Sequence, residues 1–174
     1  MIKKLQLLLL PIFLTGCMGY PKSVKPVEDF KIEGYMGTWY EIARLDHSFE
    51  RGLENVTAEY SLQDNGEVRV KNRGYSQKDK LWEQATGKAR FAKNANTGYL
   101  KVSFFGPFYG SYVIFDLDDD EYSFVCGPNT SYLWFLARNP VVPNELKRKF
   151  ITKTQKLGFE SKDLIWVNQQ ENNK

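Results

Sequence analysis

The chain of 174 residues has only two cysteines and one histidine, which removes several kinds of site. A zinc site of the Cys/His type needs about four such ligands, so none is expected. Charge of one sign is also lacking, because 24 Lys and Arg stand against 21 Asp and Glu and the two kinds alternate along the chain. A nucleic-acid-binding face needs clustered cations, so no nucleic-acid partner is expected.

The apolar run at the amino terminus is too short to cross a bilayer. Residues 5–14 follow Lys3 and Lys4, and as a helix they would span roughly 15 Å, about half of the hydrocarbon core. The run fits a secretory signal, and Leu14-Thr15-Gly16-Cys17 at its end resembles a bacterial lipoprotein signal, in which small residues precede a cysteine that is lipidated. An ordinary signal peptide with a chance cysteine is the alternative.

The lipoprotein interpretation divides the chain into three parts. Residues 1–16 are the signal peptide, 17–29 are the lipidated amino terminus and an extended tether with two prolines, and 30–174 form one domain. An Asp after the lipidated cysteine usually signals retention in the inner membrane, and Met18 stands there instead. We therefore expect a lipid anchor on Cys17, in the outer membrane and facing the periplasm.

Short β-rich segments recur from Gly37 onward, and aromatic residues are abundant at 15%. Strands are predicted at about 38–45, 55–63, 67–75, 82–91, 98–105, 111–117, 122–126 and 132–138. One apolar and one charged face over eight meandering strands predicts an all-β, up-and-down antiparallel barrel. The inward positions are rich in small residues, which favours a cavity.

A helix follows the strands. Leu146, Phe150, Thr154 and Leu157 recur at helical spacing behind Pro143, and they predict one helix packed on the barrel wall. A last strand is expected at 164–167, with no second domain.

Four segments together resemble the lipocalin family, in its bacterial lipoprotein branch. They are Gly37-Thr38-Trp39-Tyr40-Glu41-Ile42-Ala43-Arg44, Phe49-Glu50-Arg51-Gly52-Leu53, the run from Lys101 to Gly110, and Tyr132-Leu133-Trp134. The resemblance implies that Gly37 and Trp39 open the first strand, that Trp39 plugs the closed end, and that Arg138 stacks across its indole. It also implies fatty acids and lysophospholipids as ligands at the outer membrane, for lipid storage, transport or repair.

Successive connections of such a barrel alternate between its two ends. If Trp39 marks the closed end, the connections at about 46–54, 76–81, 106–110 and 127–131 lie at the open mouth. The apolar residues expected at the mouth are Phe49, Leu53, Leu81, Phe108 and Tyr109. The residues expected to line the pocket are Val56, Ala58, Tyr60, Val68, Val70, Asn72, Ala85, Gly87, Val102, Phe104, Tyr132, Trp134 and Leu136.

The charges that could meet a ligand are expected at the mouth, in water. They are Arg51, Lys78, Lys80 and Glu50, so a lysophospholipid could place its one chain in an almost uncharged pocket and leave its headgroup outside. A fatty acid would have to bury its carboxylate or find a partner for it.

Catalysis is not expected, and neither is a cofactor or metal. Cys126 has no His or Lys near it in sequence to activate the thiol, and is interpreted as a small buried hydrophobe. His47, within Asp46-His47-Ser48, is interpreted as part of a solvated loop. Two other functions stay open: an interaction module or homodimer that uses the aromatic mouth, and a lipid-modifying enzyme that depends on Cys126.

Overall fold

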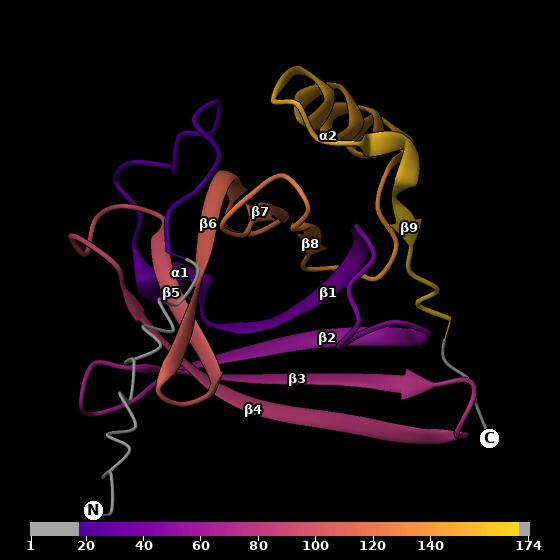
Figure 1. Ribbon diagram of the computed structural model, residues 1–174, viewed down its shortest axis with the longest axis horizontal. Helices are drawn as coiled ribbons and strands as arrows, with labels where there is room; N and C mark the ends of the chain where they lie inside the picture. The colour runs from indigo at the N-terminus through magenta and orange to yellow at the C-terminus, as the bar shows by residue number, and fades with distance from the viewer. Residues whose placement is uncertain (1–17, 171–174) are drawn as a thin grey trace, which may run out of the picture.

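The computed structural model describes residues 18–170, and its main feature is an antiparallel barrel (Figure 1). Its strands are β1 (Gly37–Arg44), β2 (Leu53–Leu62), β3 (Val68–Ser76), β4 (Leu81–Phe91), β5 (Tyr99–Phe105), β6 (Phe108–Asp118), β7 (Tyr122–Cys126) and β8 (Leu133–Ala137). Each strand pairs with the next, and β1 pairs with both β2 and β8, so the order closes into a barrel. The predicted eight-strand architecture is confirmed.

The predicted wall helix is α2 (Asn144–Lys156), which begins after Pro143. Its buried Leu146 and Phe150 pack with Phe135 of β8 in an apolar core outside the barrel wall. Gly158 ends the helix with a φ of +86°, a backbone conformation that glycine adopts without strain. After a short 3₁₀ helix, η1 (Ser161–Asp163), the chain returns as β9 (Ile165–Trp166) beside β1.

The amino-terminal segment of the described chain is extended but lies on the barrel. The backbone N–H of Gly19 donates to Tyr99 Oη at 3.1 Å, and Ser23 Oγ donates to the carbonyl of Leu157 at 2.7 Å. Val24 is buried in the outer core. The segment expected to be an extended tether therefore packs on the barrel over residues 18–29, where it buries apolar area and finds hydrogen-bond partners on the wall.

One end of the barrel is closed by α1 (Ile32–Tyr35), which leads directly into β1. Tyr35 and Trp39 are both buried, and the indole N–H of Trp39 donates to the carbonyl of Tyr35 at 2.9 Å. They belong to an inner core that fills the closed half of the barrel. The other half is hollow. Among residues 18–170, no helix is long and apolar enough to cross a membrane.

Candidate functional site

A cavity of about 510 Å³ occupies the open half of the barrel. Such a volume falls within the range of about 300–1,000 Å³ that small-molecule sites span. Its lining includes Val56, Ala58, Tyr60, Val70, Asn72, Ala85, Val102, Phe104, Tyr132, Trp134 and Leu136, with Phe49, Leu53 and Phe108 at the mouth. The structure thus brings together most of the residues expected at the pocket and the mouth.

Four expected residues do not line the cavity. Val68 is buried in the inner core near the closed end. Gly87 is covered by Phe104, since a Cβ at residue 87 would lie 2.8 Å from that ring. Tyr109 faces outward, where the guanidinium of Arg90 lies over its ring. Leu81 is exposed at the mouth end of β4, as expected, but does not border the cavity. Val68, Gly87 and Tyr109 are therefore the corrections to the expected site.

The floor of the cavity is a cluster of tyrosine hydroxyls. The hydroxyl of Tyr112 is hydrogen bonded to those of Tyr35 at 2.7 Å and Tyr60 at 2.9 Å, and Tyr35 also reaches Ser123 Oγ at 3.0 Å. Burial raises the pKa of Tyr35 to about 12 and raises those of Tyr60 and Tyr112 well above 10. These hydroxyls therefore stay neutral and give the apolar cavity a polar base.

Arg138 covers the closed end of the barrel from outside. Its guanidinium carbon lies 3.7 Å from the centroid of the Trp39 ring, the position that the family resemblance implied. The same guanidinium donates to the backbone carbonyls of Gly34, Met36, Thr38 and Asp119. The end of β8, the start of β1 and the β6–β7 turn are thereby tied together at one cation.

Three charged side chains, Glu41, Arg44 and Glu50, are buried on the mouth side of the barrel. Glu50 was expected at the mouth in water, and neither Glu41 nor Arg44 was predicted to lie inside. Arg44 is 1% exposed, and its Nη1 donates to Glu41 Oε1 at 2.6 Å. Its Nη2 donates to the backbone carbonyls of Glu50 and Leu53. Glu50 is also buried, and the indole N–H of Trp134 donates to its carboxylate at 2.8 Å. We call Glu41, Arg44 and Glu50 the internal ion cluster.

The internal ion cluster corrects the expectation of an almost uncharged lining, because Glu41 and Glu50 both border the cavity. Burial raises the pKa of Glu41 well above its ordinary value, and the neighbouring Glu50 carboxylate raises it further. Burial also raises the pKa of Glu50, opposed by the hydrogen bond from Trp134 and by Arg44. The cavity thus presents two carboxyl groups that hold their protons more tightly than carboxyl groups in water.

The position of this cluster depends on a β-bulge in β1. Tyr40 and Glu41 stand opposite Ala137 and Leu136, but the register shifts by one residue before Ala43. Side chains two residues apart in a strand lie on the same face, so Glu41 is expected to point inward like Trp39. The sequence therefore contained the signal that places Glu41 inside the barrel. The bulge then turns Arg44 inward as well. No residue type in the segment indicates that a bulge is present.

His47 is not a solvated loop residue. It is 7% exposed, and its ring stacks between Phe49 and Tyr132, with centroids 5.3 and 4.7 Å away. Burial lowers its pKa, so the ring packs as a neutral aromatic at the mouth. The adjacent Asp46 pairs instead with the exposed Arg51, and no acid–base–hydroxyl arrangement forms.

Cys126 lies on the other side of the wall from the cavity. It is fully buried in the outer core with Leu133 and Phe150, and burial raises the pKa of its thiol to about 12. A thiol in this setting stays protonated and does not meet a cavity ligand. In residues 18–170, no three His, Cys, Asp or Glu side chains gather in a way that could hold a metal ion.

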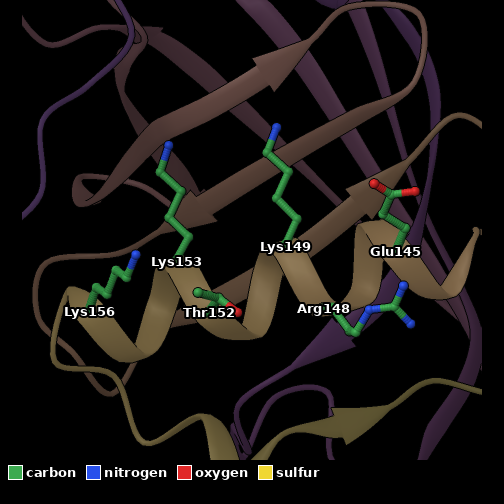
Figure 2. A pocket seen from close by; sticks show the side chains of 6 residues that line it. All are labelled: Glu145, Arg148, Lys149, Thr152, Lys153 and Lys156. Atoms are coloured by element: carbon green, nitrogen blue, oxygen red, sulfur yellow. The ribbon is translucent and has the colours of Figure 1, made fainter.

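A second hollow, shallow and open to water, runs along α2 (Figure 2). Lys149 and Lys153 extend from it across the barrel strands, and Lys153 Nζ lies 2.8 Å from a carboxylate oxygen of Asp116 on β6. Lys149 Nζ lies 3.6 Å from the same oxygen. These lysines hold the helix against the wall.

Comparison with known proteins agrees with this geometry. Residues 30–169 match the lipocalin-like domain. Over 166 residues the chain is 55% identical to the outer membrane lipoprotein Blc of Vibrio cholerae, covering 94% of this chain and 97% of that protein. Over 150 residues it is 47% identical to the outer membrane lipoprotein Blc of Escherichia coli K12, covering 86% of this chain and 85% of that protein.

Solved structures show the same fold. Insecticyanin from the tobacco hornworm Manduca sexta superposes with a TM-score of 0.72 at 22% identity, covering 88% of each chain. Cys17, the predicted lipidation site, lies outside the described residues. The Blc relatives confirm the predicted location at the bacterial outer membrane, and together with the barrel they show that the chain belongs to the lipocalin family.

Proposed function

We propose that this protein binds one single-chain amphipathic lipid, with the acyl chain in the barrel cavity and the headgroup at the mouth. The observation that carries the proposal is a cavity of about 510 Å³ in the open half of the barrel, lined mainly by apolar side chains. Burying about fourteen methylenes contributes roughly 11 kcal/mol before the costs of ordering and association are subtracted. That is sufficient for micromolar binding without an ion pair.

The internal ion cluster favours a lysophospholipid over a free fatty acid. Glu41 and Glu50 border the cavity near its mouth, and Arg44 is already bonded to Glu41 and to two carbonyls. At this side of the cavity an incoming carboxylate would meet two carboxyl groups and a cation that is already bonded. The other lining cation, Arg73, is stacked on the ring of Trp82. A zwitterionic headgroup carries its own counter-charge and can stay in water beside Arg51 and Lys78.

We further propose that Cys17 carries the lipid anchor and that the barrel faces the periplasm. The support is the signal-like sequence before Cys17 and the similarity to outer membrane lipoproteins. In the full chain, Cys17→Ser should give a folded protein that leaves the membrane fraction in high salt. A variant that stays with the membrane would contradict the anchor.

A binding role without catalysis fits the placement of the candidate nucleophile. Cys126 is buried outside the cavity with a raised pKa, and His47 is packed among aromatic rings. The alternative of an interaction module or homodimer is supported by one observation, the exposure of Phe105 and Phe108 at the mouth. A protein that exchanges lipid with a membrane also needs an exposed apolar surface of this kind. Whether lipid occupies the cavity therefore distinguishes lipid binding from the interaction module.

The proposal is tested by adding lysophosphatidylcholine and following intrinsic fluorescence, in which Trp134 of the cavity wall should be quenched. Affinity should equal or exceed that for a fatty acid of the same chain length. Ala58→Phe fills the cavity at the position paired with Trp39 and should abolish both signals. Ala85→Phe, at an exposed position that also borders the cavity, should do the same. Ala95→Phe, in an exposed turn at the closed end, is the control and should bind normally.

Unaltered binding by both cavity variants, or tightest binding of a two-chain phospholipid, would refute the single-chain site. Mass spectrometry of small molecules that co-purify with the protein gives an independent answer. A homodimer with no bound lipid would favour the interaction module.

A further inference from the structure

The barrel wall is split on one side, between β4 and the hairpin of β5 and β6. β3 pairs with β4 along the whole length of β3. β4 and β5 pair only toward the closed end, and the last pair before the mouth is Lys88 with Ser103. Beyond it β4 has a strand on one side only, and Figure 1 shows it continuing past the hairpin tip with no strand beneath it. We call this gap, between residues 81–87 and 104–108, the lateral slit.

The cavity extends to the lateral slit. Glu83, Gln84 and Ala85 of β4 border the cavity on one side of the slit. Phe104 and Phe105 of β5 border it on the other side. Since β4 and β5 are not paired over this stretch, no ladder of backbone hydrogen bonds closes the wall between these two groups of lining residues.

The β5–β6 side of the lateral slit is unusually apolar for exposed positions. Phe105 is 81% exposed and Phe108 is 49% exposed, at the tip of the hairpin, and both border the cavity. Leu81 and Trp82, at the mouth end of β4, are each about half exposed, but neither borders the cavity, and the Trp82 ring packs against Arg73 of β3. Exposed apolar side chains in a group mark surfaces that meet apolar partners. Phe105 and Phe108 form such a group beside the proposed path of an acyl chain.

We propose that a single-chain lipid enters and leaves the barrel sideways through the lateral slit, with its tail passing between β4 and Phe105. The inference rests on the proposed lipid-binding function and adds a route to it. An acyl chain that left through the rim would be drawn out lengthwise and exposed to water along its whole length. Through the slit it moves side-on past aromatic rings while the headgroup stays in water.

A reversible staple across the slit tests this route in the full-length protein. Gln84→Cys with Phe105→Cys, joined by a cleavable bifunctional thiol reagent, should slow both uptake and release of lysophosphatidylcholine by about tenfold or more. The dissociation constant should change little, since a closed route slows both directions alike. Cleavage of the reagent should restore both rates. Cys126 is fully buried and offers no competing thiol.

A matched cross-link between two strands that are already hydrogen bonded is the control. Arg69→Cys with Lys88→Cys joins register partners of β3 and β4, and exchange rates should stay at the unmodified value. Unchanged rates with the Gln84–Phe105 staple would overturn the lateral route and leave the rim as the entrance. Loss of lipid binding in the unmodified protein would instead refute the proposed function itself.

A second variant needs no cross-link. Phe105→Asp places a charge on the lip at a largely exposed position, so the fold should be retained. Transfer of lysophosphatidylcholine from phosphatidylcholine vesicles should slow several-fold, because the acyl chain must pass a charged group. Val141→Asp, at an equally exposed apolar residue before α2, should transfer at the normal rate. Equal rates for the two variants would count against the slit.

Discussion

The two ends of the barrel each contain an arginine and a tryptophan, but they use them differently. At the closed end, Arg138 lies flat on Trp39 and donates only to backbone carbonyls. At the open end, Arg44 is buried beside Glu41, and Trp134 donates to Glu50. Arg138 is held by the backbone alone and fixes the chain path, whereas Arg44 also binds the Glu41 carboxylate and so keeps a titratable group beside the cavity.

This difference predicts that substitutions at the closed end lower the free energy of unfolding. Substitutions at the open end should instead change how stability depends on pH. The largest effect is expected for Trp39→Ala, which removes a fully buried indole from the inner core. The free energy of unfolding should fall by about 3–5 kcal/mol, measured in urea. Trp166→Ala, at a partly exposed position on β9, is the control and should cost far less. Equal losses would mean that the closed end is not the main stabilising element.

A smaller effect is expected for Arg138→Ala. Loss of the stacked guanidinium and of its carbonyl partners should lower the free energy of unfolding by roughly 1–3 kcal/mol. Arg138→Lys keeps the charge but cannot bond four carbonyls at once, so it should recover only part of the loss. Lysophosphatidylcholine affinity should stay unchanged in both. A selective loss of affinity at normal stability would place Arg138 in the ligand site.

The smallest change in stability is expected for Glu50→Gln, and it should depend on pH. Because the folded-state pKa of Glu50 is raised, the native protein holds a proton that the unfolded chain releases at lower pH. Native stability is therefore lost as pH rises from the ordinary glutamate value through the raised one. Glutamine has no such proton, so the melting temperature of the variant relative to the wild type should increase from pH 5 to pH 8. Parallel curves would show that the internal ion cluster does not titrate as its burial requires.

The closed end could largely be predicted, whereas at the open end most of the pocket lining was predicted but its buried charges were not. The roles of Trp39 and Arg138 were implied by the resemblance to the lipocalin family, and the structure shows the two side chains stacked. Arg44 depends on a bulge, which adds one residue to one strand and leaves no mark in the periodicity. His47 was misinterpreted because adjacent polar residues suggest a solvated loop, while its ring is packed between aromatic side chains from the loop and from β8.

The lateral slit lay further beyond prediction. The strands β4 and β5 were both expected at nearly their observed positions, yet their pairing stops part of the way along. Alternating patterns give the face of each residue but not how far two strands stay together, which depends on the coiling of the sheet. Gly87 was assigned to the cavity for the same reason, although Phe104 covers it at the point where the slit begins.

The hydrogen bonds that hold the amino-terminal segment to the wall limit the distance between the barrel and a lipid anchor on Cys17. Gly19 is bonded to Tyr99, and only Met18 separates it from Cys17. With a lipid on Cys17, as proposed, the leash from bilayer to barrel is about two residues, or roughly 7 Å when fully extended. Under that proposal the barrel stays close to the membrane that carries the anchor, and its cavity would exchange lipids with that membrane.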